Sequence, residues 1–163
     1  MRKIVTFLWL NDQAKEAVDL YVSLFEDAKI VNTSYVTESV AEAAGVQAGT
    51  VSSVDFELHG QSFTALNGGP MYKLTEAASI AVNCKDQAEI DKLWDALSEG
   101  GNVMSCGWLT DKYGVTWQIM PESLDVMMRD PDPAKADRVS AAMLGMEGKL
   151  NLSELEKAYN NAE

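Results

Sequence analysis

An internal repeat constrains the fold of this chain more than any other feature of its sequence. Asp12-Gln13-Ala14 recurs as Asp86-Gln87-Ala88, 74 residues later. Each tripeptide follows a strand-like apolar run, residues 4–10 in the first copy and residues 78–82 in the second. Self-similarity at a fixed spacing is typical of a duplicated supersecondary unit. The sequence therefore predicts two related modules.

The residues after each tripeptide have the spacing of an amphipathic helix. Apolar side chains recur at i, i+3 and i+4, which places them on one helical face. They are Ala14, Ala17, Val18, Tyr21, Leu24 and Phe25 in the first copy, and Ile90, Leu93, Trp94 and Leu97 in the second. Asp86 with Glu89 predicts a capping box at the start of the second helix, and Gly100-Gly101 predicts its end.

A second pair of matching segments completes each module. Residues 58–66 resemble residues 112–120, and each segment is typical of two strands joined by a glycine-bearing turn. Between helix and hairpin there is room for one more strand, at residues 28–36 and 103–109. The prediction is an α+β fold of two βαβββ modules.

The rest of the chain consists of connections and a helical tail. Residues 37–50 are acidic and rich in Ala and Gly, which predicts a loop with room for one helical turn. In the tail, Asp132 before Pro133 and Asn151 before Glu154 predict two helix starts. We expect one domain of 163 residues, with modules at 1–70 and 71–122 and a helical extension at 123–163.

Charge and composition exclude several classes of function. The chain has 13 Lys and Arg against 25 Asp and Glu, a net charge of −12, and no basic cluster, so nucleic acid and anionic membrane are excluded as partners. No apolar run approaches the ~20 residues of a membrane span, and the N-terminus lacks a signal-peptide cleavage site. Two cysteines without a secretion signal indicate a cytoplasmic protein. One histidine excludes a site of several imidazoles.

Two βαβββ modules in a chain of this length resemble the vicinal oxygen chelate superfamily, the glyoxalase and bleomycin-resistance fold. Local motifs resemble one family within it, the PhnB-like proteins, also described as 3-demethylubiquinone-9 3-methyltransferase. The motifs are Phe7-Leu8-Trp9-Leu10 with Asp12, Ala14, Ala17 and Tyr21; Phe56-Glu57-Leu58 with Gly60-Gln61; and the segments 65–70, 106–109, 111–114, 117–121 and 130–133.

The resemblance implies a cup formed by two curled sheets, in which metal-dependent members bind a divalent ion. The family pattern places the four ligand positions at Val5, Thr64, Ser79 and Gln118. Transition metals in proteins are held by imidazole, thiolate or carboxylate groups. A valine, two hydroxyls and one amide do not supply these groups, so we expect no metal and no cofactor.

Strand parity places small polar and aromatic side chains on the cup face. We expect the ligand-binding residues to be Trp9, Thr64, Ser79, Asn83, Trp108, Thr116 and Gln118. Gln118 is the longest polar side chain among them and the best anchor for a ligand. The alternative is that these groups only satisfy one another or buried water. No catalytic residue stands out; Cys106 has no Lys or Arg within five residues to lower its pKa.

Three functions are compatible with these observations. The first is a metal-free, small-molecule-binding protein that forms a homodimer, with Val139, Met143 and Leu144 in a tail face open to a partner. The second is an enzyme acting on a small, quinone-like or aromatic substrate, as the family's description implies. No S-adenosylmethionine loop supports it, because Gly68-Gly69 is followed by Pro70. The third is an assembly protein whose cup is filled by its own side chains.

Overall fold

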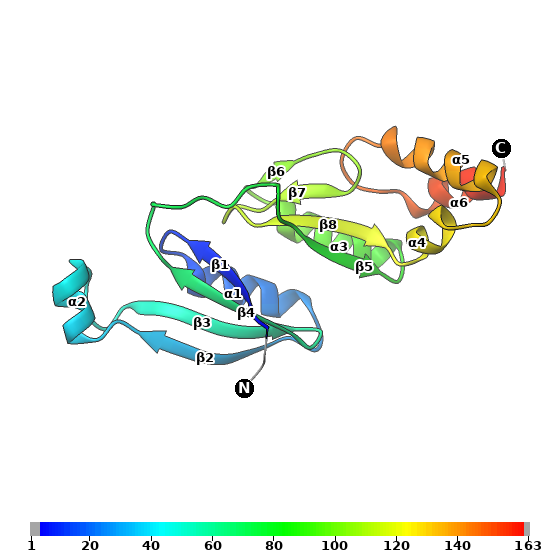
Figure 1. Ribbon diagram of the computed structural model, residues 1–163. Coiled ribbons are helices and arrows are strands. Elements are labelled where there is room, and N and C mark those ends of the chain that lie inside the picture. Colours follow the sequence, from blue (N-terminus) through cyan, green and yellow to red (C-terminus); the bar gives the residue numbers. More distant parts are fainter. Residues whose placement is uncertain (1–3, 162–163) are drawn as a thin grey trace. The chain divides into compact units, whose positions relative to one another are not determined.

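The computed structural model describes residues 4–161 and divides the chain into two compact units, Met1–Leu74 and Thr75–Glu163 (Figure 1). Each unit contains one four-stranded sheet with a helix on one face, in the order β-α-β-β-β. The predicted α+β fold of two βαβββ modules is confirmed. Among the described residues, no helix has both the length and the apolar character that a membrane span requires.

Unit 1 is a sheet in the order β1-β4-β3-β2, in which β1 runs parallel to β4 and the other pairs are antiparallel. Helix α1 covers one face and buries Val18 and Tyr21, the latter against Phe56. The elements are β1 (Thr6–Leu10), α1 (Ala14–Leu24), β2 (Lys29–Tyr35), α2 (Glu38–Ala44), β3 (Val51–Leu58) and β4 (Gln61–Asn67).

The start of α1 is held by a residue far away in the sequence. Gln13 occupies the N-cap position but makes no side-chain cap. Instead, Asn67 Oδ1 accepts a hydrogen bond from the Ala14 backbone N–H at 2.8 Å, and Asn67 Nδ2 donates to the Val51 carbonyl at 3.0 Å. One amide at the end of β4 therefore fastens α1 and β3 to the same corner of the sheet.

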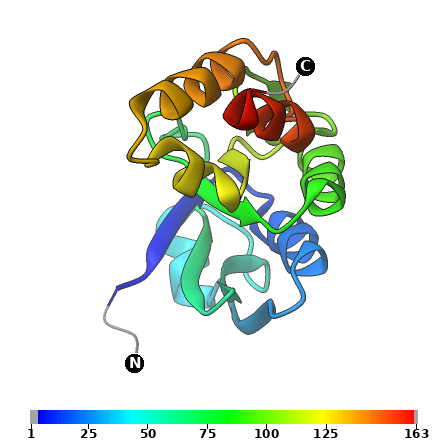
Figure 2. The same ribbon diagram turned by 90° about the vertical axis from the view of Figure 1, so that its right-hand side faces the viewer.

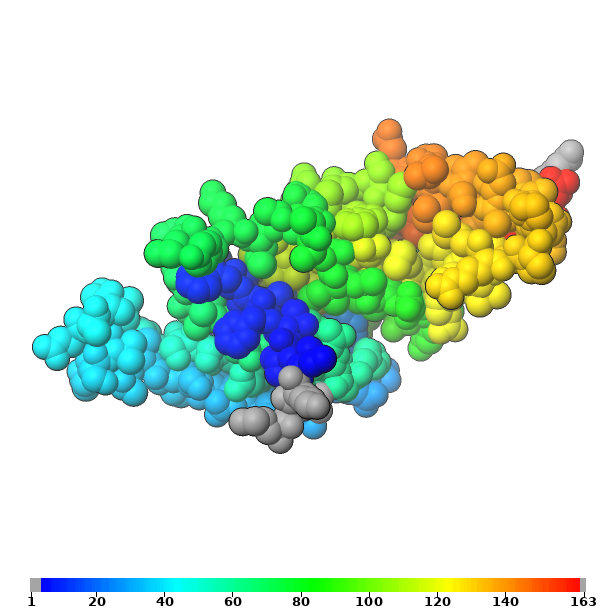
Figure 3. All heavy atoms as spheres, viewed as in Figure 1, coloured from blue at the N-terminus to red at the C-terminus, as the bar shows by residue number. Residues whose placement is uncertain are grey.

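The segment between β2 and β3 contains more structure than a loop with one turn. It forms the seven-residue helix α2, capped by the Thr37 hydroxyl, which accepts a hydrogen bond from the Val40 N–H, and ended by Gly45 at φ +68°. No residue of α2 is buried, and its atoms (cyan in Figure 3) are at the surface of unit 1. The helix forms because both of its ends are capped locally.

Unit 2 repeats the topology with the strand order β5-β8-β7-β6 and continues into three helices. Asp86 Oδ1 accepts from the Glu89 N–H at 2.9 Å, so the predicted cap of α3 is confirmed. The elements are β5 (Ile80–Cys84), α3 (Gln87–Ser98), β6 (Asn102–Val103), β7 (Trp108–Thr110), β8 (Thr116–Pro121), α4 (Ser123–Met128), α5 (Pro133–Leu144) and α6 (Leu152–Asn160).

The single strand predicted at residues 103–109 is wrong, because the chain reverses within it. Cys106 and Gly107 both have positive φ, 60° and 80°, and the chain around them turns β6 back into β7. The tail holds this turn: the Cys106 N–H donates to the Met146 carbonyl at 3.0 Å, and the Gly107 N–H donates to the Gly148 carbonyl at 2.8 Å. A partner some 40 residues away thus decides the conformation.

A buried carboxylate organises the connection between β7 and β8. Asp111 is 4% exposed. Its Oδ1 accepts from the Tyr113 and Val115 backbone N–H groups at 2.9 and 3.0 Å, and its Oδ2 accepts from Trp117 Nε1 at 2.9 Å. Buried polar groups require such partners. The glycine-bearing turn predicted within residues 112–120 is therefore built around Asp111, which also fixes the indole of Trp117.

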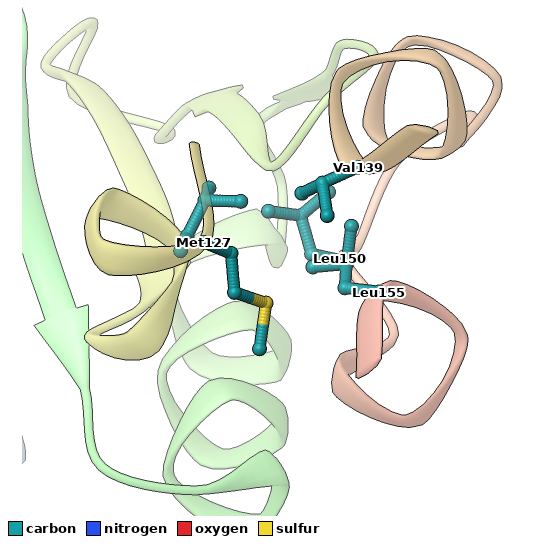
Figure 4. Packing of buried hydrophobic residues seen from close by; sticks show 5 residues of the cluster. Met127, Val139, Leu150 and Leu155 are labelled. Atoms are coloured by element: carbon teal, nitrogen blue, oxygen red, sulfur yellow. The ribbon is translucent and has the colours of Figure 1, made fainter. Parts of the chain in front are cut away.

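The helical tail has its own small core. The residues that form it come from α4, α5, α6 and the α5–α6 connection (Figure 4): Leu124, Met127, Val139, Leu150 and Leu155. Asp132 caps α5 by accepting from the Ala134 N–H at 3.0 Å, as predicted. Met143 packs against this cluster, whereas Leu144 is 69% exposed. The α5 face expected to await a partner is therefore largely used within the unit.

Side chains fasten the tail to the module and to itself. Gln87 in α3 donates from Nε2 to the Leu150 carbonyl at 3.1 Å and accepts at Oε1 from the Leu152 N–H at 2.8 Å. Arg138 donates to the Ala158 carbonyl at 2.9 Å, which holds α5 against α6 (Figure 2). The Tyr159 hydroxyl donates to Asp130, and this bond lowers the pKa of Asp130.

Candidate functional site

An open cleft of about 420 Å³ lies within unit 1. Alternate residues of β3 and β4, including Phe56 and Phe63, are buried on the side of α1. The residues between them point to the opposite face, because side chains alternate along a strand. The cleft is lined by Val5, Val31, Asp55, Phe56, Glu57, Ser62, Phe63 and Thr64.

The polar groups of this cleft follow the register of the sheet. Thr64 lies opposite Phe7 on one side and Asp55 on the other. Its hydroxyl donates to Asp55 Oδ1 at 2.6 Å, and Thr64 is only 7% exposed. Glu57, whose side chain is 14% exposed, pairs with Lys29 Nζ at 3.3 Å. The cleft therefore has an acidic, hydrogen-bonded floor.

Asp55 and Glu57 were missed by the sequence analysis, which in the first module placed candidate residues only on the first and last strand. A signal for them exists in Val54-Asp55-Phe56-Glu57-Leu58, where acidic and apolar residues alternate. Such alternation places both carboxylates on one face of the strand. The pattern indicates the face but not the neighbours, which depend on the pairing of β3 with β4.

Trp9, a predicted site residue, lies on β1 beside this region but does not line the cleft. Its Nε1 donates to the Gly69 carbonyl at 2.9 Å, and the Tyr72 ring meets it edge-on with centroids 4.9 Å apart. A Cβ on Gly68 would lie 2.2 Å from the indole, so a side chain at that position is excluded. Trp9 is thus covered by the segment that follows β4.

The remaining predicted residues come together on one face of the unit 2 sheet. Gln118 lies opposite Ala81 on β5 and Trp108 on β7, and Thr116 lies opposite Thr110. Gln118 Nε2 donates to Ser79 Oγ at 2.7 Å, and the Thr110 and Thr116 hydroxyls are 3.3 Å apart. Asn83 is on the same face and exposed. Several polar side chains of this face therefore hydrogen-bond to one another.

The four positions that the resemblance assigns to a metal do not fit one. The Val5 side chain has no atom that could coordinate a metal, and the Thr64 hydroxyl donates its hydrogen bond to Asp55. Ser79 and Gln118 bond to each other. None of the four is an imidazole, thiolate or carboxylate, the groups that bind transition metals. Across residues 4–161, no group of three or more His, Cys, Asp or Glu side chains is arranged to hold a metal ion.

The two cysteines are free thiols in different surroundings. Burial, together with the nearby carboxylates of Glu89 and Asp86, raises the pKa of Cys84 to about 12. Since the thiolate is the reactive form, Cys84 is inert as a nucleophile near neutral pH. Cys106 is half-buried in the turn between β6 and β7.

These features define a protein of two βαβββ modules, each with one sheet face carrying polar and aromatic side chains. The family model described as 3-demethylubiquinone-9 3-methyltransferase matches residues 2–120, and the chain belongs to this family. The resemblance predicted from the motifs is thereby confirmed.

One solved structure agrees with this assignment, and a second shows the same fold. The first is a Bacillus cereus protein described as a proposed 3-demethylubiquinone-9 3-methyltransferase and PhnB protein. It is 33% identical to this chain, and the match covers 74% of this chain and 99% of that chain at a TM-score of 0.65. A Pseudomonas aeruginosa protein is similar in fold, with 22% identity, 75% and 98% coverage and a TM-score of 0.56. None of the curated proteins matches the chain.

Proposed function

We propose that this protein binds a small, mostly apolar organic molecule in the cleft of unit 1, without a metal or cofactor. The cleft itself carries the proposal. Its volume of about 420 Å³ falls in the range of ~300–1,000 Å³ typical of ligand pockets. Val5 and Val31 supply apolar walls, and Thr64 and Ser62 supply polar groups to orient a ligand.

We assign the polar face of unit 2 to the same task. Asn83 is exposed, and Trp108 and Gln118 are half-buried, so the face offers an indole and an amide to a ligand. Gln118 already donates to Ser79, which orients its amide. Thr116 is 2% exposed and contributes through Thr110 rather than by direct contact.

The decisive experiment is mass spectrometry of small molecules that co-purify with the native protein. Ser62→Trp fills the cleft and is expected to abolish the bound species. Ser39→Trp, on the exposed surface of α2, is the matched control and is expected to retain it. Equal occupancy in Ser62→Trp, or no bound molecule in the unaltered protein, contradicts the proposal.

Enzymatic turnover of a small, quinone-like or aromatic substrate is the second candidate, and it rests on the family's description alone. A methyl donor site is not supported by the chain around Gly68-Gly69, since no helix follows before β5. A nucleotide-cofactor site of the glycine-rich kind consists of a strand, a glycine-rich loop and a helix in succession. Methyl transfer from S-adenosylmethionine to a demethylated quinone, measured with purified protein, tests this candidate.

We further propose a homodimer located in the cytoplasm. Phe7 on β1 is 61% exposed and Val5 is 40% exposed, an apolar surface suited to association. A twofold dimer is the commonest soluble assembly. Light scattering at micromolar concentration should give twice the chain mass, and Phe7→Ser should shift the mass toward that of the monomer. A monomeric unaltered protein contradicts the dimer.

The proposed cytoplasmic location rests on the two thiols, because free Cys84 and Cys106 suit a reducing compartment.

A further inference from the structure

We propose that the molecule bound in the unit 1 cleft carries a cationic ammonium group, which pairs with Asp55. The inference rests on the proposed function, because it names the chemical class of the ligand for the same cleft. The carboxylate lies on the middle of β3, an inner strand of the sheet, and lines the cleft together with Val5, Val31 and Phe63.

The hydrogen bonding of Asp55 leaves one side of its carboxylate for a ligand. Oδ1 accepts the Thr64 hydroxyl at 2.6 Å, which holds the carboxylate in one orientation. Among residues 4–161, no Lys, Arg or His forms an ion pair with Asp55; the lysine at this end of the sheet, Lys29, pairs with Glu57 instead. Asp55 therefore lines the cleft without a cationic partner from the described chain.

A half-buried carboxylate beside apolar walls favours a positively charged ligand. Withdrawing a carboxylate from water is unfavourable unless a partner of opposite charge compensates for the lost hydration. An ammonium group provides this through a short, charge-assisted N–H···O hydrogen bond. Glu57 is paired with Lys29, so the Asp55 carboxylate is the group in the cleft that repels an anionic ligand.

The apolar walls define the rest of the ligand. Val5 and Val31 are 40% and 56% exposed, and binding a hydrocarbon or aromatic group would remove them from water. Thr64 donates to Asp55 and so leaves its oxygen lone pairs as acceptors. The cleft thus offers acceptors and apolar surface, which matches an amine on a compact apolar body.

The test uses three probes of one shape and different charge: benzylamine, benzyl alcohol and benzoate. Each is titrated into the full chain while backbone amide resonances are followed by NMR. We expect benzylamine to shift the β3 and β4 amides and to bind at least ~10-fold more tightly than benzyl alcohol, with benzoate weaker still, since hydrogen bonds to charged groups are the stronger ones. Asp55→Asn should weaken benzylamine binding about 10-fold.

Matched variants separate charge at the cleft from charge in general. Asp137→Asn removes one negative charge from the exposed surface of α5 and should leave benzylamine binding unchanged. Thr64→Val removes the hydroxyl that orients Asp55 and should weaken binding severalfold while the spectrum stays that of the folded protein. Equal affinity of benzylamine and benzyl alcohol, or of Asp55→Asn and the unaltered protein, overturns the cation assignment and leaves the cleft as a ligand site. If no probe shifts β3 or β4, the proposed function fails as well.

Discussion

The two modules share one topology but carry different chemistry at equivalent positions. In unit 1, the row across the sheet reads Phe7, Thr64 and Asp55; in unit 2, the row reads Ala81, Gln118 and Trp108. A carboxylate in one sheet thus corresponds to an indole in the other. Backbone pairing sets the position of a side chain in such a fold and leaves its chemistry free to vary.

The modules also differ in how they are held together. In unit 1, β2 and β3 are long strands of seven and eight residues, whereas in unit 2 β6 has two residues and β7 has three. Short strands supply few backbone hydrogen bonds, so unit 2 uses the Asp111 carboxylate, the Gln87 amide and the tail instead. Unit 2 therefore depends on specific side chains more than unit 1 does.

Removing the central indole of unit 2 should have the largest effect on stability. Trp117 is fully buried and bonded to Asp111, so Trp117→Ala should lower the free energy of unfolding by about 3–5 kcal/mol through the cavity it leaves. Urea unfolding followed by circular dichroism measures this change. Trp9→Ala, on the half-exposed face of unit 1, is the control with a smaller loss. A loss below ~1 kcal/mol for Trp117→Ala would contradict this dependence.

The turns of the two units should respond differently to the same substitution. Gly60 and Gly107 have nearly equal φ values of 77° and 80°. A Cβ on Gly60 meets nothing within 4 Å, so Gly60→Ala should cost only the ~1–2 kcal/mol of left-handed backbone strain. A Cβ on Gly107 would lie 2.7 Å from the Ile119 carbonyl oxygen, so Gly107→Ala should cost about 2–4 kcal/mol. Equal losses in thermal unfolding would show that contact with β8 is unimportant.

One amide side chain in each unit offers a matched pair of tests. Asn67→Ala removes the acceptor of the Ala14 N–H, and Gln87→Ala removes the acceptor of the Leu152 N–H. Each should lower stability by about 1–2 kcal/mol, the usual effect of leaving a polar group without its partner. Hydrogen exchange should accelerate at Ala14 only in the first variant and at Leu152 only in the second. Acceleration at both sites in either variant would mean that the units open together.

The two thiols should differ in their reactivity, and this difference involves no change in the stability of the protein. Because burial raises the pKa of Cys84 to about 12, its thiolate is scarce from pH 7 to 9 and grows only as the pH rises toward 12. Cys106 is half-buried and should react first with a maleimide at pH 8. Mass spectrometry counts the labelled thiols. In the control variant Cys106→Ser, where Cys84 is the remaining thiol, we expect no rapid labelling. Rapid labelling of Cys84 would show that unit 2 opens locally.

Local features of this protein were predictable because their causes lie within a few residues. The helix caps at Asp86, Asp132 and Asn151 require only a side chain and an N–H two or three residues away. The duplicated β-α-β-β-β order follows from hydrophobic periodicity and repeated turns, and the confirmed family motifs follow from the sequence itself.

Tertiary structure alone decided the features whose partners are distant in the chain. The reversal at Cys106 depends on the Met146 carbonyl, and the cap of α1 depends on Asn67. The cleft exists because Asp55 meets Thr64 across the β3–β4 pairing, with Val5 brought alongside from the residues just before β1. A sequence pattern indicates which face a side chain occupies, but strand register and chain packing determine what that side chain meets there, and the chemistry of a site depends on those neighbours.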